Sequence, residues 1–193
     1  MNRVGEITRD TTETAVHVRL DLDGNGETAV RTGVPFFDHL LQQLGRHGGF
    51  TLQIRAEGDL AVDAHHTVED VGIVLGQAFR RALGPGRGIA RFASLHAPMD
   101  DALVLAALDI SGRPYLHYGI DVGRAVLGTF PAELAEEFFR AFATQAAVTL
   151  HLVQLHGRNA HHVLEAAFKG TGVVLHRATR VTGSEIPSTK GRL

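Results

Sequence analysis

Two stretches of alternating side chains predict strands that end in tight turns. Residues 14–23 alternate in character and lead into Gly24-Asn25-Gly26. Residues 103–110 have the same pattern and lead into Ser111-Gly112. Alternation with a period of two, closed by a glycine-containing turn, is typical of a strand with one buried face.

Helical spacing follows in both halves of the chain. Residues 36–41 and 137–142 each contain a Phe-Phe pair, and their apolar side chains recur at intervals of three and four, as on the buried face of a helix. The same spacing continues after Glu69 as far as Gly84-Pro85-Gly86, and after Glu165 toward Leu175. Glycine and proline are helix-stop signals, so the first of these two helices is expected to end there.

A repeated motif suggests that the chain is internally duplicated. The sequence Ala64-His65-His66-Thr67-Val68-Glu69 has a counterpart at residues 160–165, which begins 96 residues later in a chain of 193. Each half therefore contains strands, a helix, a strand and a helix opened by two histidines. We expect an α+β, internally duplicated two-unit fold, with sheets packed against helices. No linker separates the halves, so we expect one compact domain over 1–193 with repeats at about 1–92 and 93–193.

Composition and charge narrow the function classes. Hydrophobic residues make up 44% and charged residues 21% of the chain, which is ordinary for a folded globular protein. A net charge of -2 gives no basic field for nucleic acid or an anionic membrane surface. Without cysteine there are no disulfides or thiolate metal sites. No leader pattern follows Met1 and no long apolar run occurs, so a cytoplasmic location is expected.

The twelve histidines direct attention to metal binding. On a helix, Glu69 shares a face with His65 and with His66, which precede it by four and three residues. Adjacent histidines point about 100° apart, so each can serve a different metal ion. Imidazole and carboxylate ligands suit divalent ions such as Mn, Fe or Zn. A single motif would favour two surface histidines at a helix start, but the second copy, with His161, His162 and Glu165, favours a metal site. His39, beside Asp38, is a further candidate ligand.

Near the C-terminus, residues 187–191 (Pro-Ser-Thr-Lys-Gly) combine two hydroxyls, an ammonium group and backbone N–H groups in a short segment. This combination suits a phosphate group, although the spacing is not that of a nucleotide-binding P-loop. The alternative is a frayed polar tail. Arg91 and Arg113 are candidates for bidentate phosphate contacts.

Seven motifs in order resemble the imidazoleglycerol-phosphate dehydratase family, lyases of histidine biosynthesis. The similarity extends from Glu13 to Gly191 and implies a duplicated α+β fold, two Mn²⁺ ions per active site, and a small phosphate substrate. It also implies a homo-oligomer of trimers assembled into a 24-mer, with sites at subunit contacts. The motifs are Phe36-Phe37-Asp38-His39, 63–70, 98–101, 109–114, 159–162, 165–169 and 187–191.

The resemblance also implies roles for individual residues. Glu137, before the second Phe-Phe pair, stands where the family pattern has histidine, and we expect its carboxylate to ligate the metal instead. Glu13 falls on a carboxylate implicated in proton transfer. The implied metal ligands are His39, His65, His66, Glu69, His161, His162 and Glu165, and the implied substrate-side residues are Gln43, His47, Arg91, Arg113, Lys169, Ser188, Thr189 and Lys190.

The implied reaction dehydrates D-erythro-imidazole glycerol phosphate to imidazole acetol phosphate. No carbonyl acidifies the proton that must leave, so the imidazole ring has to accept the electrons, through a dimetal-stabilised imidazolate and diazafulvene intermediate. Glu13 is the leading acid/base candidate, while Glu69 and Glu165 are ligands expected also to relay protons. From the residues alone, a metal-dependent hydrolase and a noncatalytic divalent-metal binder remain alternatives.

Overall fold

The computed structural model describes residues 3–193. Its described part contains two four-stranded sheets, a two-stranded ribbon and four helices. The elements in chain order are β1 (Val4–Asp10), β2 (Thr14–Asp21), β3 (Thr28–Arg31), α1 (Pro35–Gly48), β4 (Thr51–Gly58), α2 (His65–Leu83), β5 (Phe92–Met99), β6 (Ala102–Asp109), β7 (Tyr115–Gly119), β8 (Val126–Leu127), β9 (Phe130–Pro131), α3 (Leu134–Ala146), β10 (Thr149–His156) and α4 (Ala160–Thr179).

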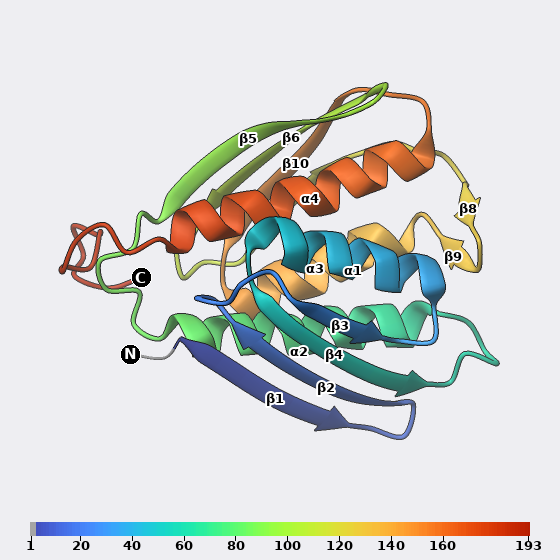
Figure 1. The fold of residues 1–193 in the computed structure, drawn as a ribbon, viewed down its shortest axis with the longest axis horizontal. Helices are drawn as coiled ribbons and strands as arrows, with labels where there is room; N and C mark the ends of the chain where they lie inside the picture. The colour runs from blue at the N-terminus through green and yellow to red at the C-terminus, as the bar shows by residue number, and fades with distance from the viewer. Residues whose placement is uncertain (1–2) are drawn as a thin grey trace.

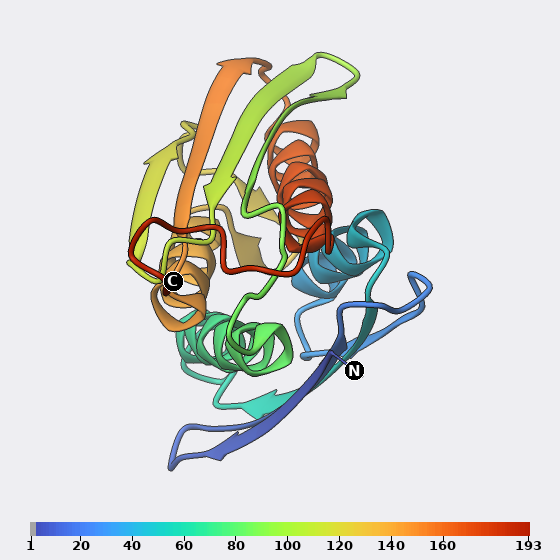
Figure 2. The same cartoon turned by 90° about the vertical axis from the view of Figure 1, so that its left-hand side faces the viewer.

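The two large sheets form the outer layers, and the helices lie between them (Figures 1 and 2). The strand orders are β1-β2-β4-β3 and β5-β6-β10-β7. In each sheet the first two pairings are antiparallel and the last is parallel. The two sheets thus share one topology, and the expected α+β, two-unit fold is confirmed. The boundary between repeats near residue 92 stays a prediction, although β5 begins there.

The helices pair across the two halves. Helix α1 of the first half packs against α4 of the second, and α2 packs against α3. Glycines allow the close approach: a Cβ atom on Gly172 would lie 2.3 Å from the carbonyl oxygen of Leu44, and one on Gly76 would lie 2.7 Å from that of Phe142. Gly76 and Gly172 are 96 residues apart, the spacing of the His-His motifs. Each half therefore depends on the other for its core.

Buried aromatic rings fill the space between the helix pairs. Phe138 stacks on Phe168 with ring centroids 5.1 Å apart, and Phe37 stacks on Phe130 at 5.7 Å. All four side chains are fully buried. Such contacts add about 0.5–1.5 kcal/mol per pair beyond the apolar area they bury.

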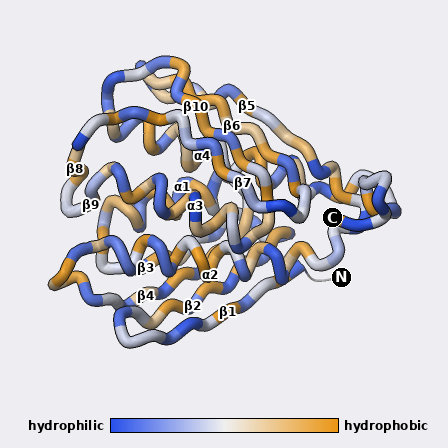
Figure 3. Tube along the Cα trace, turned by 180° about the vertical axis from the view of Figure 1, so that it is seen from behind, coloured by the Kyte–Doolittle hydropathy of each residue, from blue (hydrophilic) through white to orange (hydrophobic). Residues whose placement is uncertain are grey.

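The outer faces of the two sheets differ in polarity. The first sheet turns Gln53 and Arg55 outward, so β4 alternates between buried apolar and exposed polar residues. Strand β6 instead is apolar on both faces, with Leu103 and Leu105 only partly buried, and it forms a nearly unbroken hydrophobic segment in Figure 3. Leu155 of the neighbouring β10 is exposed. The outer face of the second sheet is therefore more apolar along β6 than that of the first sheet is along β4, with polar residues such as His96 and His151 on the flanking strands.

Among the described residues, no helix has the length and apolar character that crossing a membrane requires.

Replacing Gly172 by alanine tests the helix contact. We expect Gly172→Ala to lower the free energy of unfolding by about 1–3 kcal/mol, because the methyl group meets backbone atoms that cannot move independently. Gly170→Ala in the same helix is the control, since its Cβ would meet only methyl groups at 3.2 and 3.3 Å. Both substitutions replace glycine by alanine within a helix, so the favourable change in helix propensity is the same in the two variants. Urea denaturation at one protein concentration compares them, and equal stabilities would contradict the packing account.

Candidate active site

The four helices begin at the same end of the molecule, and the C-terminal segment lies at the opposite end (Figure 1). Histidines occupy the first turns of α2 and α4. Asn159 caps α4 and accepts the backbone N–H of His161 at 3.0 Å, and Asp63, just before α2, accepts the backbone N–H of His65 at 2.7 Å. Helix N-termini carry partial positive charge, which favours carboxylates nearby. This end therefore gathers imidazoles and acids.

One metal-type cluster forms among the described residues. His39 of α1 and His161 of α4 direct their Nε2 atoms at the same oxygen of Glu165, at 3.2 and 3.0 Å. The three ligand atoms all lie within 4.8 Å of one another. Phe36 lies beside both imidazoles, 5.0 Å from the His161 ring and 6.1 Å from the His39 ring. Two nitrogen donors and one carboxylate in this arrangement are a donor set that divalent first-row metals accept.

A lysine keeps the buried carboxylate of this cluster ionised. Lys169 lies one helical turn after Glu165, with its Nζ atom 2.5 Å from Oε1. Burial alone raises the pKa of Glu165, but hydrogen bonds from Lys169, His39 and His161 outweigh burial and lower that pKa to about 2. An anionic oxygen is therefore available as a ligand near neutral pH.

The cluster continues along the two helices as a polar seam. On α1, His39, Gln43 and His47 are spaced four apart and share one face. On α4, Glu165 and Lys169 follow the same spacing. Burial lowers the pKa of His47, and the Lys169 charge lowers it further. The predicted substrate-side residues of both helices thus adjoin the metal-type cluster.

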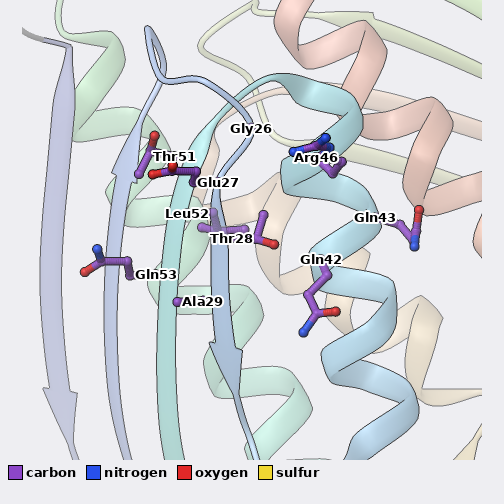
Figure 4. Close-up of a pocket in the computed structure, with 10 residues that line it drawn as sticks. All are labelled: Gly26, Glu27, Thr28, Ala29, Gln42, Gln43, Arg46, Thr51, Leu52 and Gln53. Carbon is purple, nitrogen blue, oxygen red and sulfur yellow. The ribbon is translucent and has the colours of Figure 1, made fainter.

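A separate groove of 630 Å³ lies beside α1 and the strands β3 and β4. Figure 4 shows Gln42 and Arg46 on the strand-facing part of α1, whereas Gln43 projects on the other side, away from β4. The groove is therefore distinct from the seam between α1 and α4, even though Gln43 forms part of its rim.

The first His-His pair lies apart from this cluster. His66 directs Nδ1 at Asp59 Oδ2, 2.9 Å away, and Nε2 toward Glu13 Oε1, 3.9 Å away. The hydrogen bond with Asp59 raises the pKa of His66. The His65 ring stands at 88° to that of His66. With Glu69, the two imidazoles do not form a three-ligand cluster within the described structure, and the expectation that neighbouring histidines serve different ions stays a prediction.

His162 has a matching environment. Its Nδ1 lies 2.7 Å from Asp101 Oδ1 and its Nε2 lies 3.5 Å from Asp100 Oδ2. The other Asp101 oxygen accepts the backbone N–H groups of Arg158 and Asn159. Together with His162, these donors hold the pKa of Asp101 well below its usual range.

Glu137 lies outside the cluster of three. It is in the first turn of α3 and contacts Arg140, with 3.6 Å between Oε2 and Nε. Its position nevertheless matches that of His39: each lies 12 residues before the threonine that opens the next strand, Thr149 or Thr51. The structure thus gives Glu137 the equivalent place in the second half without an observed ligand partner.

The candidate phosphate residues lie at the opposite end, where the C-terminal segment folds back. Arg91 makes a bidentate contact with Asp109, at 2.8 and 3.3 Å, and donates to the carbonyl of Pro187 at 2.7 Å. Ser188 Oγ accepts the backbone N–H of Lys190 at 3.2 Å. The segment is therefore folded as a turn and is not a frayed tail. Lys190, Thr189 and Arg113 are exposed there.

Comparison with known proteins agrees with this geometry. The family model for imidazoleglycerol-phosphate dehydratase matches residues 32–175. The chain belongs to this family. Imidazoleglycerol-phosphate dehydratases from Azoarcus sp. strain BH72 and Aromatoleum aromaticum are 53% and 54% identical over 99% of the chain and 100% of their own length.

Solved structures of the family share the fold. A Pyrococcus furiosus dehydratase in complex with (S)-C348 is 38% identical with a TM-score of 0.85, covering 97% of this chain and 100% of its own. The Staphylococcus aureus enzyme is 35% identical with a TM-score of 0.82, covering 91% and 97%. Membership of a dehydratase family makes the chain a hydro-lyase with a role in histidine biosynthesis, and the resemblance seen in the sequence is confirmed.

Two carboxylates of this dehydratase were not predicted as site residues. Asp59 and Asp101 contact the histidine pairs, but both come from loops outside the His-His motifs. Asp101 belongs to a motif of the resemblance, residues 98–101, without an expected role. Asp59 carries no motif of its own, although it is in the short loop that joins β4 to α2, seven residues before His66.

Replacing Arg91 by lysine tests how the C-terminal turn is held. Lysine cannot make the bidentate contact with Asp109 while also donating to Pro187. We expect amide hydrogen exchange in residues 185–192 to speed up about 10- to 100-fold, since one charge-assisted hydrogen bond is worth about 1.5–3 kcal/mol and about 1.4 kcal/mol corresponds to a factor of ten. Arg87→Lys is the control, because Arg87 is an exposed arginine of the same loop. Unchanged exchange in Arg91→Lys would show that the turn is held by other contacts.

Proposed function

We propose that this chain dehydrates D-erythro-imidazole glycerol phosphate to imidazole acetol phosphate through a dimetal centre. The observation that supports it most directly is the convergence of His39 and His161 on the buried carboxylate of Glu165. The relatives' names supply the substrate class. The cluster supplies ligands for a metal ion able to act on an imidazole ring.

The residues present fit a divalent metal. The cluster offers two imidazole nitrogens and one ionised oxygen, and thiolates are absent from the chain. Bound there, two Mn²⁺ ions per active site would supply Lewis-acid chemistry at the substrate ring, which favours its imidazolate form. The proposed ligands are His39, His65, His66, Glu69, Glu137, His161, His162 and Glu165.

The other steps of the proposed reaction take place on the substrate and on the acidic side chains of this protein. Once the ring has lost its N–H proton, its electrons expel the hydroxyl, which leaves as water after protonation, and a diazafulvene forms. The neighbouring carbon then loses its proton, the diazafulvene ring takes up that electron pair, and the resulting enol tautomerises to the ketone. Glu13, exposed and facing the His66 ring, is the proposed acid/base. Glu69 and Glu165 are proposed to relay protons. A positioned acid/base of this kind contributes about 10²- to 10⁴-fold to the rate.

The phosphate group is assigned to the C-terminal turn. Arg91 is already committed to Asp109 and Pro187, so it shapes the turn. Arg113 and Lys190 lack side-chain ion pairs at 4.0 Å or less among the described residues and retain charge for an anion. With Ser188 and Thr189 they form a site that binds and orients the substrate.

The proposed metal ligands and phosphate residues lie at opposite ends of one chain. From Glu165 to the end of α4 is 14 residues, or about 21 Å of helix, and the phosphate turn lies beyond that end (Figure 1). The substrate has only a three-carbon chain between ring and phosphate. We therefore propose that each site combines the metal end of one copy with the phosphate end of another.

The apolar outer face of the second sheet supports such assembly. The apolar outward side chains of β6, Leu103 and Leu105, are only partly covered within one chain, and exposed apolar surface can mark interaction sites. The first sheet shows that this fold does not itself require such residues on its outer face. Trimers assembled into a 24-mer, and a cytoplasmic location, remain part of the proposal.

One assay separates this function from its alternatives. Protein loaded with Mn²⁺ and incubated with D-erythro-imidazole glycerol phosphate should yield the ketone product, whereas Glu165→Gln should bind less metal and lose at least about 10²-fold in kcat. Gln42→Glu, on the strand-facing side of α1, is a control for charge change nearby. Metal binding without turnover would favour a noncatalytic metal binder, and phosphate release in place of the ketone would favour a hydrolase.

A further inference from the structure

Each His-His pair has one histidine held by a carboxylate from outside its helix: Asp59 from the loop that leads into α2, and Asp101 from the turn between β5 and β6. We propose that Asp101 and Asp59 are positioning residues that set the ring tautomer of His162 and His66, so that Nε2 of each ring is presented as a metal ligand. The inference rests on the proposed metal-dependent function and adds two residues that act through the ligands.

The contacts of His162 indicate which nitrogen carries the proton. Nδ1 lies 2.7 Å from Asp101 Oδ1, which is hydrogen-bond distance, while Nε2 lies 3.5 Å from exposed Asp100. A neutral imidazole donates through one nitrogen and accepts through the other. The closer carboxylate therefore places the proton on Nδ1 and leaves the lone pair on Nε2, on the side of the ring that faces Asp100.

The first half reaches the same arrangement with a different loop. His66 Nδ1 lies 2.9 Å from Asp59, whereas Nε2 lies 3.9 Å from Glu13. Asp59 follows β4, while Asp101 lies between β5 and β6. The two carboxylates are therefore not repeat equivalents. Two loops that are not repeat equivalents each place a carboxylate at Nδ1 of the ring. We take this as evidence that metal binding by the ring requires the carboxylate, because a carboxylate hydrogen-bonded to a ligating histidine fixes the ring's orientation and strengthens its basicity.

The two aspartates differ in the hydrogen bonds of the carboxylate oxygen that does not contact the histidine. Oδ2 of Asp101 accepts the backbone N–H groups of Arg158 and Asn159, at 2.8 and 3.2 Å. An asparagine there keeps both bonds only if its NH₂ group faces His162. Nδ1 must then accept, and the ring proton moves to Nε2, where it blocks a metal. Oδ1 of Asp59 is buried without a hydrogen-bond partner among the described residues, so an asparagine can keep its oxygen toward His66.

The experiment measures Mn²⁺ affinity, with free Mn²⁺ followed by its paramagnetic resonance signal during titration of the full-length protein after metal removal. Asp101→Asn should weaken the affected site about 10- to 100-fold, and Asp59→Asn should weaken binding less. Asp121→Asn, which removes a negative charge from an exposed loop, should bind as the unmodified protein does. Circular dichroism confirms that each variant is folded.

A double-mutant cycle tests whether Asp101 acts through the histidine. If it does, Asp101→Asn combined with His162→Ala should bind Mn²⁺ no more weakly than His162→Ala alone, whereas an independent structural effect would add. Additive losses, or an Asp101→Asn affinity equal to that of the unmodified protein, would overturn the positioning role and leave the proposed function intact. Failure of the unmodified protein to bind Mn²⁺ would overturn both.

Discussion

Helix α4 lies against the backbone of α1 at Gly172, and the candidate site depends on this contact. A Cβ atom at that position would lie 2.3 Å from the Leu44 carbonyl oxygen, so only glycine permits the observed separation of the helices. Because the two helices start at the same end and run in the same direction, close packing at Gly172 also sets the distance between His39 and Glu165 one to two turns earlier. Residues 126 positions apart in sequence thereby become neighbours.

The same packing governs the charge of the site. Glu165 is only 6% exposed in its side chain, and an isolated carboxylate at that depth would take up a proton. Lys169 and two imidazoles surround it and keep it anionic. The carboxylate is thus both buried and ionised, a state that is unfavourable without positively charged or hydrogen-bonding partners. A bound cation would also stabilise the carboxylate charge, in place of some of these partners.

Internal duplication accounts for a candidate site that has a metal side and a separate substrate side. The halves share strand order and the His-His helix, yet they differ where the helices pair. The α1–α4 seam carries His39, His47 and Lys169, whereas in the α2–α3 contact Ala141 and Gln145 pack beside Gly72 and Gly76. The α1–α4 contact therefore forms a polar seam next to the metal-type cluster, whereas the α2–α3 contact mainly forms part of the protein core. A fold that began as two similar units can in this way support a site with distinct metal and substrate sides.

Much of the fold and of the candidate site could be predicted from the sequence, because side-chain periodicity and repeated motifs are features of short stretches of the chain. Periodicity of three and four located the helices that begin before Phe36 and Glu137, and the repeat located both His-His motifs. Pairing of α1 with α4 could not be predicted, since the role of Gly172 depends on a backbone distant in sequence. Asp59 lies only seven residues before His66, so their contact is local in sequence, yet no motif or periodicity marks Asp59 as a partner of the ring. The C-terminal turn was open between two interpretations until Arg91 was seen to hold it.

The central claim is that metal ligands and phosphate residues from different copies form each site. Co-expression of His161→Ala and Lys190→Glu chains with different tags, followed by purification through both tags, tests it at substrate concentrations below KM. Each variant alone should be nearly inactive. The mixed particles should recover about a quarter of the full activity, because a site drawing its two ends at random from an equal mixture is intact in that share of cases. Activity no greater than the average of the two variants would contradict the account and place both ends of the site in a single chain.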